Sequence, residues 1–135
     1  MFTRRIGKID IDIFNQFRNQ KYLNLETFRK SGEGVKTPVW FAQDGNILYV
    51  QTGANSGKVK RIHNNGHVNV ATCKMDGKVV GSWIPAHACV VTDPEVYLFS
   101  NRLLGRKYGI LKKMFENQRV KKSAKDIILE IRMNE

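Results

Sequence analysis

Two turn signals, Asp44-Gly45-Asn46 and Asp76-Gly77, constrain the fold of this chain most strongly. Aspartate or asparagine beside glycine favours tight hairpin turns, because these residues tolerate the positive φ angles that such turns require. The segments on both sides are rich in β-formers or alternate apolar with polar side chains, as strands do. We therefore expect two antiparallel hairpins. Their strands are residues 35–43 and 47–52 around the first turn, and 67–75 and 78–91 around the second.

Helical patterns are predicted on both sides of these hairpins. Residues 22–30 resemble a short helix with Asn24 as its N-cap. Asp93-Pro94-Glu95 combines a capping side chain, a proline at the first helical position and an acidic first turn. Gly105 and Gly109 are expected to break this helix, and a further helical piece follows them.

The two ends of the chain carry different patterns. Residues 1–20 are predicted to be a helical N-terminal extension that packs on the domain or on a partner subunit, although alternation at residues 9–12 also fits a short strand. Residues 127–133 alternate as a half-buried antiparallel strand does. The apolar positions with near-helical spacing in the extension are Ile6, Ile9, Ile13, Phe14 and Phe17.

The length of 135 residues suits a single domain, residues 1–135, with a core large enough to need no disulfide or metal. No linker, repeat or low-complexity tract divides it. With about six strands and two to four helices, the fold class is α+β, an antiparallel barrel. No apolar run reaches the length of a membrane span, and no signal peptide follows Met1. We expect a soluble cytoplasmic protein.

The formal net charge of +11 favours a polyanionic partner, such as a phosphorylated small molecule, nucleic acid or an anionic membrane. Nine of the 23 basic residues lie between Arg102 and Lys125, so part of this charge belongs to a local surface. Aromatic residues do occur among basic ones, but they have core-like spacing within strands. We therefore do not expect nucleic acid to be the partner.

The stretch from Gln51 to Arg61 is the best candidate for an anion site. A strand ends in small residues, and a helix then begins with three basic residues in its first turns. The unpaired N–H groups of a helix start suit a phosphate, and glycine lets the backbone approach it closely. A solvated basic helix after an ordinary turn is the alternative. The spacing is not that of a Walker A loop, because Val59 stands where Ser or Thr should hold magnesium.

No catalytic side chain is predicted. The serines lie in no known nucleophile motif, and the acidic residues are explained by turns and caps. The histidines and cysteines show no recognised metal-ligand spacing, so no metal is expected. If the protein is an enzyme, a cofactor supplies the chemistry and the protein supplies orientation and electrostatics. The residues considered as metal ligands are His63, His67, His87, Cys73 and Cys89.

Three stretches, Tyr22–Lys30, Lys36–Phe41 and Thr52–Ile62, resemble a known family. They are similar to the pyridoxamine-5′-phosphate-oxidase-like split β-barrel proteins, in particular the deazaflavin-dependent branch that uses coenzyme F420. The resemblance runs from about residue 21 to residue 91. Two features depart from it: Gly66-His67 replaces a common proline, and the segment before Lys21 is longer than usual.

This resemblance implies an FMN-binding type of split barrel with short flanking helices, and a homodimer with the cofactor between its subunits. It implies that one strand, with Lys36, Thr37, Pro38 and Val39, runs along the cofactor's ring. It also implies that a second set forms the phosphate cradle. That set comprises Gln51, Thr52, Ser56, Gly57, Lys58 and Arg61.

The leading hypothesis is an oxidoreductase that transfers hydride between coenzyme F420 and a small unsaturated organic acceptor. An FMN-dependent oxidoreductase is the alternative within the same fold. A non-enzymatic flavin carrier or nucleic-acid-binding protein is the alternative from another class. Lys58 and Arg61 are three residues apart and should share a helix face, where both could contact one phosphate. Lys112, in the basic C-terminal region, is the control, and its replacement by alanine is expected to leave binding nearly intact.

Overall fold

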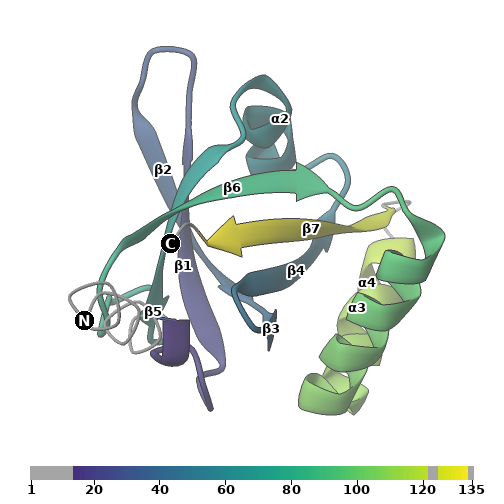
Figure 1. The fold of residues 1–135 in the computed structure, drawn as a ribbon. Coiled ribbons are helices and arrows are strands. Elements are labelled where there is room, and N and C mark those ends of the chain that lie inside the picture. The colour runs from purple at the N-terminus through teal and green to yellow at the C-terminus, as the bar shows by residue number, and fades with distance from the viewer. Residues whose placement is uncertain (1–13, 122–124, 134–135) are drawn as a thin grey trace.

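The computed structural model describes residues 14–121 and 125–133, which form one curled antiparallel sheet flanked by helices (Figure 1). Seven strands pair in the order β2-β1-β5-β6-β7-β4-β3. The strands are β1 (Tyr22–Phe28), β2 (Gly34–Trp40), β3 (Ala42–Asp44), β4 (Ile47–Gly53), β5 (His67–Cys73), β6 (Ile84–Val90) and β7 (Asp126–Met133). The helices are α2 (Gly57–Asn64), α3 (Pro94–Tyr108) and α4 (Ile110–Lys121).

The first and last strands of the sheet, β2 and β3, are joined in sequence by Phe41 alone. The sheet must therefore curl until its two edges meet near this residue. Phe41 is fully buried and packs edge-on against Phe17 at 5.7 Å between ring centroids. The expected α+β class and antiparallel split barrel are confirmed.

Two apolar clusters fill the two faces of the curled sheet. The larger one lies inside the curl and includes the buried side chains of α2, Val59 and Ile62. The smaller one lies between the sheet and α3, around Tyr49, Leu104 and Ile128. Successive residues of β4 alternate between these clusters, because side chains of a strand point to opposite faces. Which face a residue occupies therefore decides which helix it can meet.

The predicted helix at residues 22–30 is wrong, because these residues form β1 in the middle of the sheet, between β2 and β5. Leu23, Leu25 and Thr27 alternate at the period of a strand and are all fully buried. Asn24 is not a helix cap. Its side-chain amide donates to the carbonyl of Gly77, at 2.8 Å, in the turn that follows β5.

Most other predicted elements are confirmed, with shifted boundaries. Asp93 caps α3 by accepting from Glu95 N at 2.9 Å. Gly105 lies inside α3 and does not break it, whereas Gly109, with φ at 58°, ends it. The strand predicted to begin at residue 78 begins at Ile84. No helix in the described ranges 14–121 and 125–133 is long and apolar enough to cross a membrane.

The predicted N-terminal extension falls largely outside the described residues, since residues 1–13 are not among them. Within the described part, residues 14–19 form a short helical turn before β1. Phe17 is buried to 1% exposure and Phe14 packs against the main cluster. The final part of this segment is therefore bound to the barrel rather than held away from it.

Candidate functional site

The start of α2 has the geometry expected of an anion site. Ser56 is the N-cap, with an extended backbone, and its hydroxyl accepts from Val59 N at 3.4 Å. Val59 and Ile62 are buried against the sheet, which fixes the rotation of this short helix about its axis. The first turn contains no acidic residue, so its partial positive charge is not offset within the helix.

Arg61 lies back over this helix start. Its Nε donates to the hydroxyl of Thr27, a fully buried residue of β1, at 2.7 Å. Its guanidinium also lies against Gly57, because a Cβ placed there would be 2.8 Å from Arg61 Nη1. Among the described residues, Arg61 forms no salt bridge with a carboxylate. A helix start and a guanidinium are both positive, so a bound anion would relieve their mutual repulsion.

Gly57 is therefore needed because the guanidinium of Arg61 comes close to its Cα, and not because its backbone has a special conformation. Lys58 follows it and is half-buried, whereas Lys60 is exposed. The two lysines therefore differ in burial although they lie on the same short helix.

The four β2 residues predicted to line a cofactor ring divide between the two faces of an edge strand. Lys36 and Pro38 are exposed, and the ammonium of Lys36 lies 5.3 Å from the ring centroid of Trp83. Thr37 and Val39 point to the side of the main cluster, against which Val39 packs. Because β2 pairs only with β1 in the described sheet, its other edge offers backbone groups to a ligand.

Gln51 and Thr52 point in opposite directions, so the structure does not bring both to α2. Thr52 is buried. The amide of Gln51 donates to Glu116 Oε2 at 2.6 Å and to Asp126 Oδ2 at 2.9 Å, on the face covered by α3 and α4. Here Gln51 links β4 to α4 and β7.

Lys112 belongs to the same polar cluster, so Lys112→Ala is a poor control for the fold although its predicted lack of effect on binding stays a prediction. Its ammonium lies 2.6 Å from Glu116 Oε2 and the residue is only 8% exposed. The sequence shows a run of basic residues there, but it does not show that one of them faces inward with a carboxylate one helical turn away. Lys113 is exposed and is the better solvated control.

Thr27 is the site residue that the sequence analysis missed. Because residues 22–30 were assigned to a helix, Thr27 was not placed with Leu23 and Leu25 on the inner face of a strand. The period-two alternation of these three residues is the signal that could have found it.

Of the histidines and cysteines considered as metal ligands, His63 lies on α2 and the others lie on β5 and β6. His67 and His87 are opposite each other on β5 and β6. Cys73 is buried, and burial raises the pKa of its thiol. No group of three metal-binding side chains occurs in the part of the chain that the structure describes.

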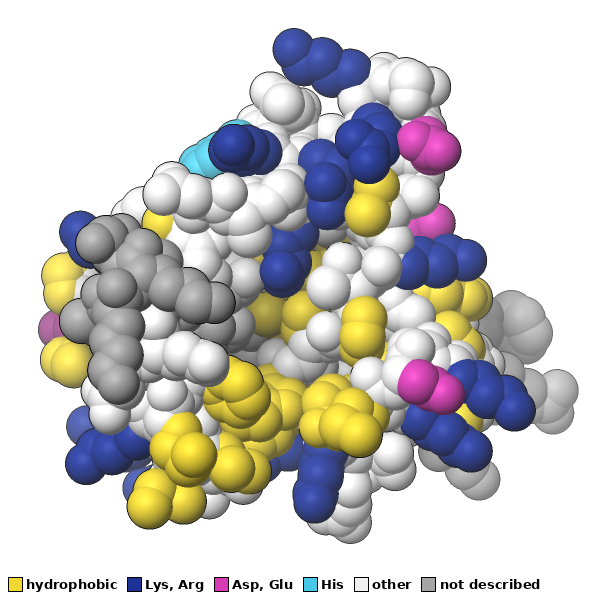
Figure 2. Space-filling model, turned by 180° about the vertical axis from the view of Figure 1, so that it is seen from behind, with side chains coloured by type: hydrophobic (Ala, Val, Ile, Leu, Met, Phe, Trp, Pro, Cys, Tyr) yellow, Lys and Arg dark blue, Asp and Glu magenta, His cyan; other side chains and the backbone are white. Residues whose placement is uncertain are grey.

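One face of the molecule carries both charged and hydrophobic side chains. Seen from behind, Lys and Arg side chains lie around a hollow in which hydrophobic side chains are visible, and further hydrophobic side chains gather below it (Figure 2). Exposed large apolar residues are concentrated on α3 and α4. Those on the two helices are Leu98, Phe99, Ile110, Leu111, Met114 and Phe115.

Comparison with known proteins places the fold among split barrels. A candidate pyridoxamine 5′-phosphate oxidase from Listeria innocua matches with a TM-score of 0.60 and 15% identity over 96% of this chain and 94% of that one. The haem storage protein of Vibrio cholerae matches with a TM-score of 0.69 and 14% identity, covering 95% and 90%. An F420 reductase matches with a TM-score of 0.56 and 16% identity, covering 90% and 94%. No protein-family model and no curated protein matches the chain.

Proposed function

We propose that the protein is an oxidoreductase that transfers hydride between coenzyme F420 and a small unsaturated organic acceptor. The observation that carries this proposal is Arg61, which is directed by a buried threonine across the first turn of a helix that lacks acidic residues. The fold supports it, since split barrels similar to this one include an F420 reductase. FMN is the alternative cofactor.

The residues around α2 fit the phosphate of either cofactor. Ser56 would offer its hydroxyl proton, because its backbone N–H already donates to the carbonyl of Gly53. Gly57 and Lys58 would offer backbone N–H groups, Lys58 also its ammonium, and Arg61 the donors left after its bond to Thr27. Lys60, exposed on the same helix, would meet the acidic tail by which coenzyme F420 exceeds FMN. Charge-assisted bonds of this kind would fix the position of the cofactor.

The edge of β2, from Lys36 to Val39, would position the cofactor ring. The bound deazaflavin supplies the hydride. The chain's own contribution is to bind the phosphate, orient the ring along the free edge and exclude water with apolar side chains. No described side chain is assigned as the proton donor, so the proton would come from solvent.

The proposal includes a homodimer in which a second copy completes the cofactor groove. The exposed apolar residues on α3 and α4 support an association of this kind, because a large exposed apolar surface often marks an interface. Light scattering should then show a dimer. A stable monomer that still binds cofactor at micromolar concentration would contradict this part.

The test of the function is a spectroscopic titration of the purified protein with coenzyme F420 and, separately, with FMN. The two chromophores absorb at different wavelengths, so saturable spectral changes identify the preferred one. Tighter binding of FMN would favour the alternative cofactor. No binding of either, together with tight and salt-sensitive DNA binding, would favour the non-enzymatic alternative.

A further inference from the structure

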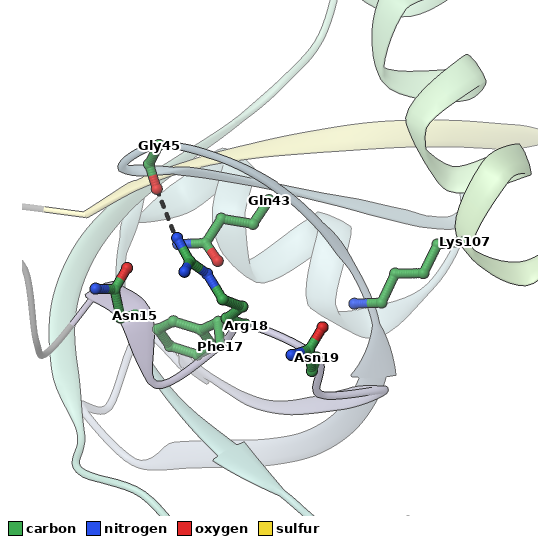
Figure 3. A pocket seen from close by; sticks show the side chains of 7 residues that line it. All are labelled: Asn15, Phe17, Arg18, Asn19, Gln43, Gly45 and Lys107. Carbon is green, nitrogen blue, oxygen red and sulfur yellow. Dashed lines mark hydrogen bonds between the residues drawn. The ribbon is translucent and has the colours of Figure 1, made fainter.

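A polar pocket of about 420 Å³ is seen from close by in Figure 3. The segment before β1, which supplies part of its lining, lies at the end of the barrel away from α2 (Figure 1). The segment before β1, the turn between β3 and β4 and the last turn of α3 surround the pocket. None of the residues assigned to the cofactor site lines this pocket. It is therefore a separate feature of the molecule.

Among the described residues that line the pocket, two are cations, and none is acidic. Figure 3 shows Arg18 reaching in from the segment before β1 and Lys107 from α3, on the other side. The Nζ of Lys107 lies 3.6 Å from the ring centroid of Phe41 and donates to the carbonyl of Phe41 at 2.9 Å. An ammonium has three donors, so two remain for a ligand.

The surroundings of Lys107 also favour an anion. Burial of the ammonium lowers the pKa of Lys107 from 10.5 to about 8, so the group is still charged at neutral pH but has lost part of its hydration. An anion in the pocket would replace the lost hydration.

The polar neutral side chains are held in place. The amide nitrogen of Gln43 donates to the carbonyls of Phe14 and Gly45, both at 2.9 Å, which leaves its amide oxygen to accept from a ligand. Asn19 has φ at 61°, a left-handed conformation that few residues other than glycine adopt. Such constrained residues often occur where a binding site is built.

We propose that this pocket binds a small organic oxyanion, a carboxylate or a phosphate monoester that also carries a hydroxyl group. The anionic group would lie between Arg18 and Lys107, and the hydroxyl would donate to Gln43 Oε1. Arg18 would supply a planar fork, which suits both kinds of anion. This inference does not depend on the proposed cofactor, because no lining residue is shared between the two sites.

The test is an NMR titration of the full chain with glycerol 3-phosphate and with malate at constant ionic strength. We expect saturable shifts of backbone amide signals in residues 15–19 and at Gly45, with Gly57 unchanged. Arg18→Gln should weaken binding about tenfold or more, because a charge-assisted pair is lost. Arg106→Gln is the matched control, since Arg106 is exposed on α3 outside the pocket lining, and it should leave affinity unchanged.

Three outcomes would overturn the proposal. These are the absence of saturable shifts with both probes, equal weakening by Arg18→Gln and Arg106→Gln, and shifts centred on Gly57 instead of Gly45. Arg18 is exposed, so its substitution should not disturb folding, and the thermal midpoint checks this. Lys107→Gln is a second variant, and the amide spectrum shows whether it keeps the fold.

Discussion

Arg61 on α2 and Lys112 on α4 are both cations on short helices, but their surroundings differ. Lys112 is buried and lies 2.6 Å from the carboxylate of Glu116. Arg61 is held by a neutral hydroxyl, and its guanidinium lies over a helix start with no acidic residue in the first turn. A cation whose charge is already balanced contributes to the fold, whereas one held in place without a counterion is available for a ligand. Net charge alone does not distinguish these roles.

The largest effect is expected for Lys112→Ala, and it should fall on stability. Removing the ammonium takes the Lys112 cation away from the partly buried carboxylate of Glu116, which keeps its hydrogen bond from Gln51. Unfolding in denaturant should show a loss of about 2–3 kcal/mol, below the full cost for a completely buried pair because Glu116 keeps some solvent. Under conditions in which the variant is folded, its affinity for the cofactor should stay within about twofold of the wild-type affinity. A loss of affinity without a loss of stability would mean that Lys112 serves cofactor binding and not the fold.

Arg61→Ala should instead act on binding. Losing a charge-assisted contact to phosphate removes about 1.5–3 kcal/mol, which weakens cofactor binding by roughly one to two orders of magnitude. Stability should fall by no more than about 1 kcal/mol, since only the bond to Thr27 is lost. Lys113→Ala is the control on an exposed helix position. Equal losses of affinity in both variants would mean that the cofactor responds to diffuse charge.

Tyr108→Phe should show a smaller effect that depends on pH. The Tyr108 hydroxyl accepts from Phe41 N at 3.0 Å, and its proton is shared between the carbonyls of Lys21 at 2.7 Å and Phe41 at 2.9 Å. Removing it takes a partner from Phe41 N and from the carbonyl of Lys21, whereas the carbonyl of Phe41 still accepts from Lys107. The expected cost is about 1–2 kcal/mol in the free energy of unfolding at pH 7.

The pH dependence follows from the phenol's pKa, which burial raises to about 12. Between pH 10 and 12 the unfolded chain loses this proton while the folded chain keeps it, so the stability that the phenol contributes is lost as pH rises. The difference in unfolding free energy between wild type and Tyr108→Phe should shrink across this window. A constant difference would show that the hydroxyl is not buried in this network.

Gly57→Ala is expected to have the smallest effect. Its Cβ would meet Arg61 Nη1 at 2.8 Å, but the guanidinium ends a flexible side chain and can move. Stability should change by less than about 1 kcal/mol, because alanine also favours the helix. Cofactor binding should weaken by roughly threefold to tenfold as Arg61 is displaced. Gly105→Ala on α3, where a Cβ meets no atom within 4 Å, should leave binding unchanged in the same titration.

The sequence predicted the elements that local chemistry determines. The turn at Gly45, the cap at Asp93 and the helix after Ser56 all depend on residues close together in the chain, and all are present. Residues 22–30 were assigned to the wrong class because a short apolar pattern fits both a helix and a strand. Pairing with the next strand, β2, and with β5, which is distant in sequence, decides between them.

The candidate site could be predicted only in part, again because local patterns do not show contacts between residues that are distant in sequence. The short stretch from Ser56 to Arg61 contains its own cap, glycine and basic residues, so it could be found locally. The bond from Arg61 to Thr27 joins residues 34 positions apart, and no local pattern indicates it. Gln51 points to the face of the sheet that α3 and α4 cover, and no local pattern shows that Glu116 of α4 meets it there.

The single residue between β2 and β3 has a mechanical consequence. Because Phe41 alone joins the first and last strands of the sheet, a slip of β2 along β1 would pull β3 along β4 as well. A slip of one residue would turn every side chain of both strands to the wrong face. Lys107 and Tyr108 both bind the backbone of Phe41, and so α3 holds the register of both ends of the sheet at one point.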